Sequence, residues 1–260
     1  MIAIDQNRVD SPPPGNELLV VPDICLYENI KGTDWQTSFN KSFSSYRAQS
    51  QRLHIAHAIG SLLRQELASG KPIATIVDWE WSKWLQQEIG NTHLSSNFIQ
   101  RVDQLKARPL EPEVNLADNR RDLESGLCAF KRLAGDQLCN ALRESANSQN
   151  KIQLSDVAPA LRQLTLRTLP YTLEGLGITN PGQSPLLAAS SVFFRNLLCF
   201  WMHIFQFARD SGNIALGDKR LLNDLVDSDY AVIGTFCDGL ITGDSRMRER
   251  YEGIKAALQI

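Results

Sequence analysis

The sequence predicts an α/β protein in which a small parallel sheet is flanked by helices and carries a large, predominantly α-helical insertion. Residues 17–23 form a short, continuous apolar run with a proline near its end, which is typical of a strand buried on both faces of a parallel sheet. Residues 238–242 predict a second short strand, and residues 34–207 carry apolar side chains mainly at helical spacing. A strand near each end, with helices between them, predicts that the two ends of the chain build the sheet.

The composition excludes several classes of protein. The 260 residues are 43% hydrophobic and 22% charged, which is typical of a globular protein and excludes a disordered chain. The formal net charge is -2, so affinity for a polyanion would have to come from a local patch. Five widely spaced cysteines without a C-x-x-C pair predict neither a disulfide framework nor a zinc site, and favour a reducing, cytoplasmic location.

The pattern along the chain divides it into an arm, a sheet-forming part and an insertion. Residues 1–16 contain three consecutive prolines and predict a flexible arm without a signal peptide. Polar residues interrupt the apolar segment 186–207, which predicts a buried helix and no membrane partner. Apolar positions at 53–63 predict a helix that ends at Gly70 and Pro72. Further helices are expected at 73–89, 123–145, 154–169, 188–209, 219–237 and 245–258.

Aspartates are unusually dense between residues 218 and 244. Asp224 and Asp227 are three residues apart on a predicted helix and share a face, where like charges repel unless a cation lies between them. Hard divalent ions such as Mg²⁺ or Mn²⁺ prefer carboxylate oxygen. The segment holds six aspartates in all: Asp218, Asp224, Asp227, Asp229, Asp238 and Asp244.

Two aspartates, one of them already among these six, follow the predicted strands. Asp23 ends the apolar run at 17–23, and Asp244 comes two residues after the strand at 238–242. Ligand sites of open α/β sheets form at the carboxyl ends of the strands, so we expect Asp23 and Asp244 to converge with Asp224 and Asp227 on one metal site. An all-carboxylate metal site is suited to the hydrolysis of phosphodiesters.

Three segments resemble the acidic signature of PIN and PIN-like domains. They are Val-Val-Pro-Asp-Ile-Cys at 20–25, Asn-Asp-Leu-Val-Asp-Ser-Asp-Tyr at 223–230 and Cys-Asp-Gly-Leu-Ile-Thr-Gly-Asp at 237–244. The family contains metal-dependent ribonucleases of bacterial toxins and RNA-processing proteins. The resemblance implies a PIN-like domain built from 17–33 and 215–260, with a helical insertion at 34–214. It implies an endoribonuclease in which Mg²⁺ or Mn²⁺ is held by Asp23, Asp224 or Asp227, and Asp244, with Asp238 as an outer member.

Several assignments around this site stay open. A second acid on an early helix is usual in the family, and Glu28, Glu66, Glu80 and Glu88 are the candidates. Three cations near the aspartates, Lys219, Arg246 and Arg250, would bind the phosphates of an RNA substrate, or else form ion pairs on a solvated helix.

Two other functions are compatible with the sequence. Arg52 and His57 have the spacing of the metal-independent HEPN ribonucleases, in which such a pair cleaves through the ribose hydroxyl. A non-catalytic helical protein-interaction subunit is the alternative outside enzymology. A neutralising or regulatory protein is a candidate partner of the nuclease. Three tryptophans, at 79, 81 and 84, would either stack unpaired bases or anchor a helix in the core.

Overall fold

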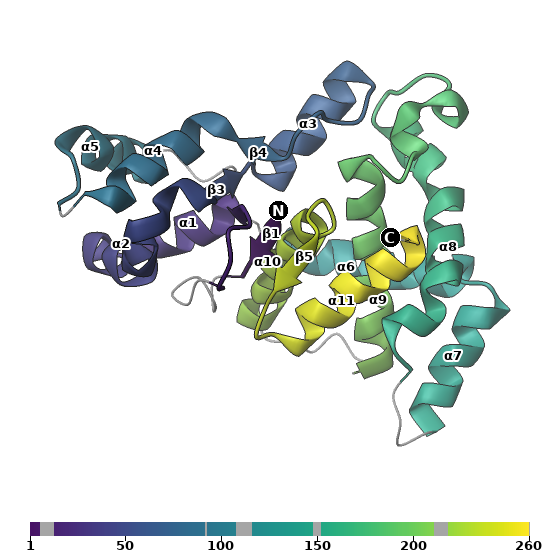
Figure 1. Ribbon diagram of the computed structural model, residues 1–260. Coiled ribbons are helices and arrows are strands. Elements are labelled where there is room, and N and C mark those ends of the chain that lie inside the picture. The colour runs from purple at the N-terminus through teal and green to yellow at the C-terminus, as the bar shows by residue number, and fades with distance from the viewer. Residues whose placement is uncertain (6–12, 92, 108–115, 148–151, 211–217, 260) are drawn as a thin grey trace. The chain divides into compact units, whose positions relative to one another are not determined.

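The computed structural model describes residues 1–5, 13–91, 93–107, 116–147, 152–210 and 218–259 (Figure 1). The chain is a mixed α/β protein with a five-stranded, mostly parallel sheet, as the sequence predicts. It divides into two compact units, which we call the sheet unit and the helical unit. The sheet unit comprises Met1–Ile59, Thr75–Glu113 and Ile233–Asp244, and the helical unit comprises Gly60–Ala74, Val114–Val232 and Ser245–Ile260.

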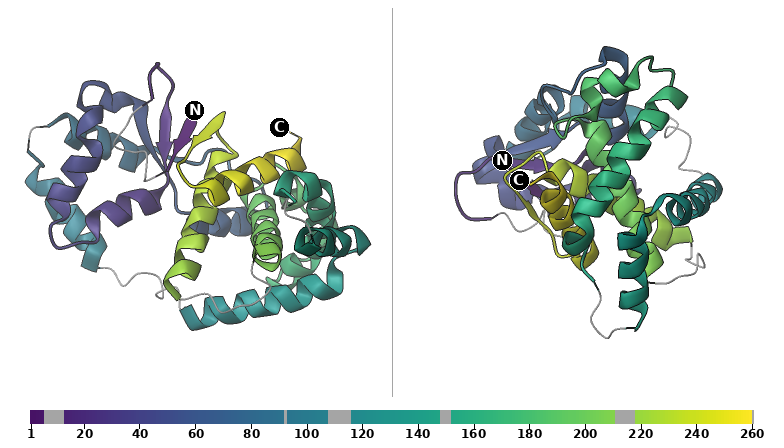
Figure 2. Two further views of the ribbon diagram at one scale, coloured as in Figure 1. Left: turned by 90° about the horizontal axis from the view of Figure 1, so that it is seen from below. Right: turned by 90° about the vertical axis from the view of Figure 1, so that its right-hand side faces the viewer.

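The sheet has the strand order β4-β3-β2-β1-β5 and can be followed in Figure 1 and the left view of Figure 2. Strands β1 to β3 and β5 are parallel, and only the short β4 at the edge is antiparallel to its neighbour. The bounds are β1 Ile2–Ile4, β2 Leu19–Val21, β3 Leu53–Ala56, β4 Val77–Asp78 and β5 Gly239–Ile241. The strands expected near residues 17–23 and 238–242 are therefore present as β2 and β5.

Strand β1 lies at the centre of the parallel part of the sheet, where the sequence had predicted a flexible arm. Ile2 pairs with Leu19 on one side and with Gly239 on the other. Ala3 and Ile4 are completely buried. The prediction was wrong for this part of the arm because a strand of three residues is too short to show a period. Residues 6–12 of the predicted arm lie outside the described residues.

The helices of the sheet unit bury an aromatic cluster. Trp35, Phe39 and Phe43 lie on one face of α2, and the rings of Trp35 and Phe39 contact Phe98 of α5. The helical elements of this unit are α1 Asp23–Ile30, α2 Trp35–Phe43, the 3-10 segment η2 Ser44–Arg52, α4 Trp79–Gly90 and α5 Ser96–Ala107.

Residues 53–56 form the strand β3, although the sequence predicted that they begin a helix that ends at Gly70 and Pro72. All four side chains are buried, and β3 pairs with β2 and β4. The apolar residues here fit either a helical or an extended period, and burial on both faces of the sheet erases the alternation that would have distinguished the two. The helix α3 starts only at Ile59 and ends at Ser69.

The helical unit is organised around the buried helix α9. Most of its side chains, including Phe194, Leu198 and Phe205, are buried, as predicted for this apolar segment. None of the helices searched, in the described residues, is long and apolar enough to cross a membrane. The helical elements of this unit, besides most of α3, are α6 Leu116–Leu133, α7 Asp136–Asn147, α8 Leu154–Gly175, η3 Pro181–Gln183, η4 Pro185–Leu187, α9 Val192–Asp210, most of α10 Asp218–Gly234 and α11 Ser245–Leu258.

Glu66 of α3 fixes the beginning of α9. Its fully buried carboxylate accepts hydrogen bonds from the amides of Val192 and Phe193, at 2.9 and 2.8 Å, and from the Ser191 hydroxyl at 2.6 Å. It also accepts the amide of Ile73 at 3.1 Å. The first N–H groups of a helix have no partner within the helix, and a negative charge there interacts favourably with the helix dipole. Glu66, one candidate for the second acid of the metal site, is therefore structural.

We expect Glu66→Gln to lower the free energy of unfolding by about 2–4 kcal/mol, because the amide loses the charge and turns an N–H donor toward other donors. Urea denaturation measures the change. The matched substitution Glu174→Gln, at an exposed site on α8, should change stability by no more than about 0.5 kcal/mol. Equal effects of the two substitutions would contradict the structural role of Glu66.

Candidate functional site

The order of the strands singles out one place at the carboxyl edge of the sheet. The chain passes from β1 to β2 and β3 on one side, and β5 lies on the other side of β1. In open parallel sheets, ligands bind at the carboxyl ends of the strands where the order reverses in this way. We therefore expect functional side chains in the segments that follow β1 and β5.

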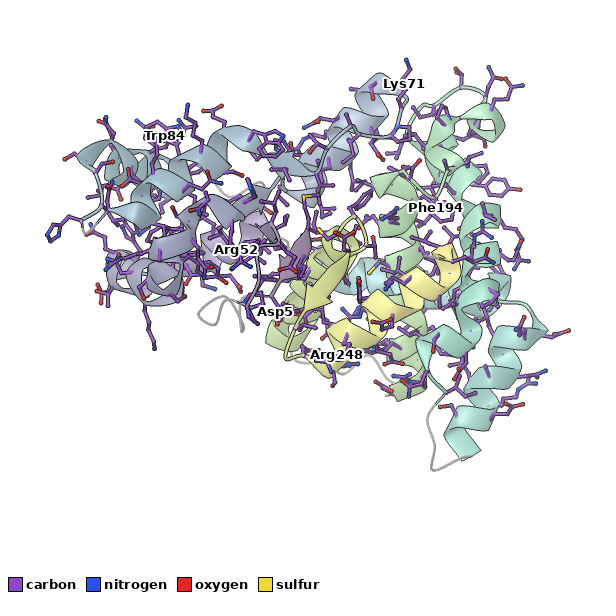
Figure 3. All side chains as sticks on the ribbon, in the orientation of Figure 1. Asp5, Arg52, Lys71, Trp84, Phe194 and Arg248 are labelled. Carbon is purple, nitrogen blue, oxygen red and sulfur yellow. The ribbon has the colours of Figure 1, made fainter. Side chains whose placement is uncertain are left out.

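Asp5, Thr242 and Asp244 are linked by hydrogen bonds at this position. The Thr242 hydroxyl donates to Oδ2 of Asp5 at 2.9 Å, and it accepts the amide N–H of Asp244 at 3.0 Å. The amide of Asp5 donates to the carbonyl of Ile241 at 3.0 Å, which continues the ladder between β1 and β5. Asp5 is labelled in Figure 3. The threonine thus holds the Asp5 carboxylate in one orientation and fixes the turn that carries Asp244.

Asp5 and Thr242 are functional candidates that the sequence analysis missed. Ile2-Ala-Ile-Asp5 repeats the pattern of an apolar run followed by an aspartate that drew attention to Asp23. A hydroxyl residue two positions before an aspartate is a known local turn motif, because the side-chain oxygen accepts the amide N–H two residues later. Both signals were present in the sequence.

Glu28 of α1 is a second acid that interacts with Asp5. Burial raises the pKa of Glu28, Lys31 lowers it, and the negative charge of Asp5 raises it further. The negative charge of Asp5 thus acts on Glu28 across the same part of the sheet unit. Glu28 is therefore the candidate for the early-helix acid that the structure connects with the edge of the sheet.

The other candidates for this acid have structural partners. Glu88 is buried and accepts hydrogen bonds from the amide and hydroxyl of Ser95, at 2.8 and 2.6 Å. Glu80 is exposed and forms an ion pair with Arg101 at 2.7 Å. Both fix local structure between α4 and α5.

Asp23 begins α1 two residues after β2, close to the carboxyl end of the strand as expected. Its pKa is raised to about 6, mainly by burial; amide hydrogen bonds at the start of the helix lower it, and the charge of Asp78 raises it. Asp78 in turn lies 3.2 Å from Nδ1 of His57, which follows β3. The carboxyl edge thus carries Asp244, Asp5, Asp23 and His57 after four neighbouring parallel strands.

Asp238 lies at the opposite edge of the sheet. It precedes β5, whereas Asp244 follows it, and its exposed carboxylate forms an ion pair with the amino group of Met1. The hydrogen bond and the charge of this amino group lower the pKa of Asp238. The prediction that Asp238 is an outer member of the site was wrong, because a strand separates the two aspartates.

In the helical unit, the carboxylate of Asp224 forms ion pairs with two arginines. Its buried carboxylate lies 3.1 Å from Nη1 of Arg246 and 3.8 Å from Nη2 of Arg250. Arg250 is completely buried and donates to the side chain of Gln206 at 2.9 Å and to the backbone carbonyl of Asp224 at 2.7 Å. Arg246 also forms an ion pair with Asp210. These contacts give Arg250 a structural role in place of the predicted phosphate binding and engage Arg246 in ion pairs.

The remaining residues of the predicted cluster are less closely defined. Asp227, one helical turn after Asp224, is half-buried. The side chain of Lys219 lies outside the described residues. The expected convergence of Asp23 and Asp244 with Asp224 and Asp227 joins residues of the two units and stays a prediction.

Arg52 and His57 do not form a HEPN-type pair. They flank β3, so about 16 Å of extended chain lies between them. The buried Arg52 guanidinium donates to the carbonyl of Glu17 at 3.0 Å and to the side chain of Gln49. The helix on which the HEPN interpretation depends is replaced by this strand.

Within the described residues, no group of three or more His, Cys, Asp and Glu side chains is arranged to hold a metal ion. Comparisons with models of protein families, with curated proteins and with solved structures find no match to this chain. The interpretation of the site therefore depends on its residues alone.

We expect Asp23→Asn to stabilise the protein more at pH 7.5 than at pH 4. The folded state raises the pKa of Asp23 from 3.8 to about 6, so it binds the proton more tightly than the unfolded chain. The wild type therefore loses stability as the pH rises through this range, and the asparagine does not. Urea denaturation should show that the advantage of the variant grows by about 1–3 kcal/mol.

The exposed Asp34 supplies the control for this measurement. Asp34→Asn should have a small effect at both pH values, because its side chain is solvated in the folded and unfolded states. An advantage of Asp23→Asn that is constant or shrinks with rising pH would contradict the assignment.

Proposed function

We propose that the chain is a metal-dependent nuclease, an endoribonuclease, whose site is the carboxyl edge of the sheet unit. The observation that carries the proposal is the hydrogen-bonded chain from Asp244 through Thr242 to the buried Asp5 at the reversal of strand order. A carboxylate held in one orientation beside another acidic residue is an arrangement suited to a hard cation. The resemblance of residues 237–244 to the PIN signature supports the same chemistry.

Carboxylates of the kind found at this edge are the ligands that Mg²⁺ and Mn²⁺ prefer, although no three of them are grouped around one point in the described residues. Asp5 and Asp244 would be ligands, and Glu28 would be the acid from the early helix, with Asp23 on the neighbouring strand end. All are carboxylates, and no cysteine or neutral imidazole is needed. The raised pKa values of Glu28 and Asp23 support a site where a cation would offset an energetic cost, because burial and like charge both disfavour the ionised forms.

Thr242 and Asp5 would have different roles in the proposed site. The Thr242 hydroxyl donates a hydrogen bond to one oxygen of the Asp5 carboxylate, and this bond keeps the carboxylate from rotating. Burial of Asp5 keeps bulk water from competing for its charge. The bound cation would supply an activated water and neutralise negative charge on the phosphate.

We expect Mn²⁺ to raise the midpoint of thermal unfolding. An ion present at 100 times its dissociation constant adds about 2.7 kcal/mol to the free energy of unfolding. For a chain of this size that is a shift of roughly 5 °C or more. Asp5→Asn should abolish the shift while leaving the metal-free protein as stable as the wild type or more so, because the amide oxygen still accepts the Thr242 hydroxyl.

Three further variants test whether the Mn²⁺ effect comes from this site. Thr242→Val removes the hydroxyl and should weaken the Mn²⁺ effect, and Thr242→Ser should preserve it. Asp103→Asn changes an exposed carboxylate on α5 and should respond to Mn²⁺ like the wild type. No shift in the wild type, or an equal shift in Asp5→Asn, would remove the metal site and favour the non-catalytic interaction subunit.

We also expect cleavage of a single-stranded RNA that requires Mg²⁺ or Mn²⁺ and stops in EDTA. Attack by water on the phosphorus leaves a 5′-phosphate and a 3′-hydroxyl, which end-labelling of the products detects. Asp244→Asn should lower the rate by about 100-fold or more through the loss of a ligand. Cleavage that persists in EDTA and leaves a cyclic phosphate would instead indicate attack by the ribose hydroxyl.

A further inference from the structure

Trp79 is an exposed aromatic side chain on the sheet unit. It is the first residue of α4, directly after β4, and 57% of its surface is accessible. The other tryptophans of the segment, Trp81 and Trp84, are half-buried, and the guanidinium of Arg101 lies 4.9 and 5.2 Å from the centres of their rings. The three tryptophans therefore differ: two are packed under an arginine, and Trp79 is presented to solvent.

The position of Trp79 is held rigidly from both sides. The preceding residue, Asp78, caps α4 by accepting the amide of Trp81 at 3.0 Å. The hydroxyl of Ser82 accepts the amide of Ile55 in β3 at 2.9 Å and donates to the carbonyl of Asp78, which ties the first turn of α4 to the sheet. The ring of His54 meets the ring of Trp79 nearly at a right angle, with centroids 5.2 Å apart. An exposed ring that is fixed in this way loses little entropy when it binds a ligand.

Trp79 is connected to the acidic edge of the sheet through the preceding residue, Asp78, although β4 is antiparallel to β3 and Trp79 itself lies level with His54. The carboxylate of Asp78 that caps its helix is also 3.2 Å from His57 at the carboxyl end of β3, and it raises the pKa of Asp23. Three strand spacings separate β4 from β1, which is roughly 14 Å. A single-stranded nucleic acid several nucleotides long spans that distance.

An exposed cation accompanies the ring. Lys83 is four residues after Trp79 on α4, so the two side chains share a face of the helix. An aromatic ring beside an ammonium group matches the two parts of a nucleotide, because the base stacks on the ring and the phosphate pairs with the cation.

We propose that Trp79 and Lys83 form a binding site for single-stranded RNA, in which a base stacks on Trp79 and a neighbouring phosphate binds Lys83. The proposal rests on the proposed nuclease function and extends it by assigning two residues outside the acidic edge that would bind the unpaired RNA. The site takes any base, because every base has a flat face.

The test measures binding of a fluorescein-labelled 12-nucleotide oligouridine to the full chain by fluorescence anisotropy, in EDTA so that no cleavage occurs. Trp79→Ala should weaken binding about 5- to 100-fold, the loss expected for one stacked base, and Trp79→Phe should weaken it less than about threefold. Lys83→Ala should weaken binding and reduce the salt dependence by about one phosphate contact. Tyr171→Ala is the control, because Tyr171 is a 74% exposed aromatic residue of the helical unit and should not matter.

A second probe separates stacking from a general effect on the fold. An abasic 12-mer with the same ribose-phosphate backbone should bind the wild type more weakly than oligouridine, and Trp79→Ala should bind the two equally. Equal affinity of wild type and Trp79→Ala for oligouridine, or an undiminished preference of the variant for bases, would overturn the proposal.

The outcome is distinguishable from failure of the nuclease assignment. Wild-type protein that shows the Mn²⁺ shift in thermal unfolding but binds no oligouridine would overturn the RNA site and leave the metal site standing. Protein that binds oligouridine through Trp79 but shows no Mn²⁺ shift would keep the binding site and remove the nuclease.

Discussion

The parallel pairing of β1 with β5 is the constraint on which the rest of the sheet unit depends. It brings together residues that are 237 positions apart, as in the hydrogen bond from Thr242 to Asp5. Closing so long a loop costs conformational entropy, although the cost grows only slowly with length. Burial of Ala3, Ile4 and their neighbours in β2 offsets it. In the sheet as described, β1 is the only strand beside β5, so the place of Asp244 next to Asp5 exists only while this pairing holds.

The two units treat buried acids in opposite ways. In the helical unit, burial alone would raise the pKa of Glu249, but hydrogen bonds from Arg209 and Gln206 lower it. Asp224 is likewise matched by Arg246 and Arg250. At the carboxyl edge of the sheet, the pKa values of Asp23 and Glu28 are raised, and other carboxylates contribute to both shifts. The raised pKa values of the acids at the edge are therefore the electrostatic observation behind the proposed cation site.

The sequence predicted the fold class and two of the strands, because runs such as Leu19–Val21 are apolar without interruption and are followed by breaks. It could not predict β1 or β3. Three apolar residues at the start of the chain carry no period, and Leu53–Ala56 fits a helix as well as a strand until its hydrogen-bonded neighbours are known. The sequence placed Asp244 after a strand, as the structure does, but it did not point to Asp5 because the strand β1 before it was not predicted. Asp238 was misplaced because the spacing along a sequence does not say on which edge of a sheet a residue lies.

Asp224 and Asp227 show why a shared helical face is weak evidence for a shared site. Residues three apart on a helix point in similar directions, but what they meet depends on the elements that pack against each turn. The turn of Asp224 faces α11, which supplies Arg246 and Arg250, and this carboxylate is buried in ion pairs. Asp227 remains half-buried one turn later. The arginines therefore compensate the charge of Asp224 without a metal ion. The proposal of a divalent ion then depends on the sheet edge, where Thr242 orients the Asp5 carboxylate and fixes the turn that carries Asp244.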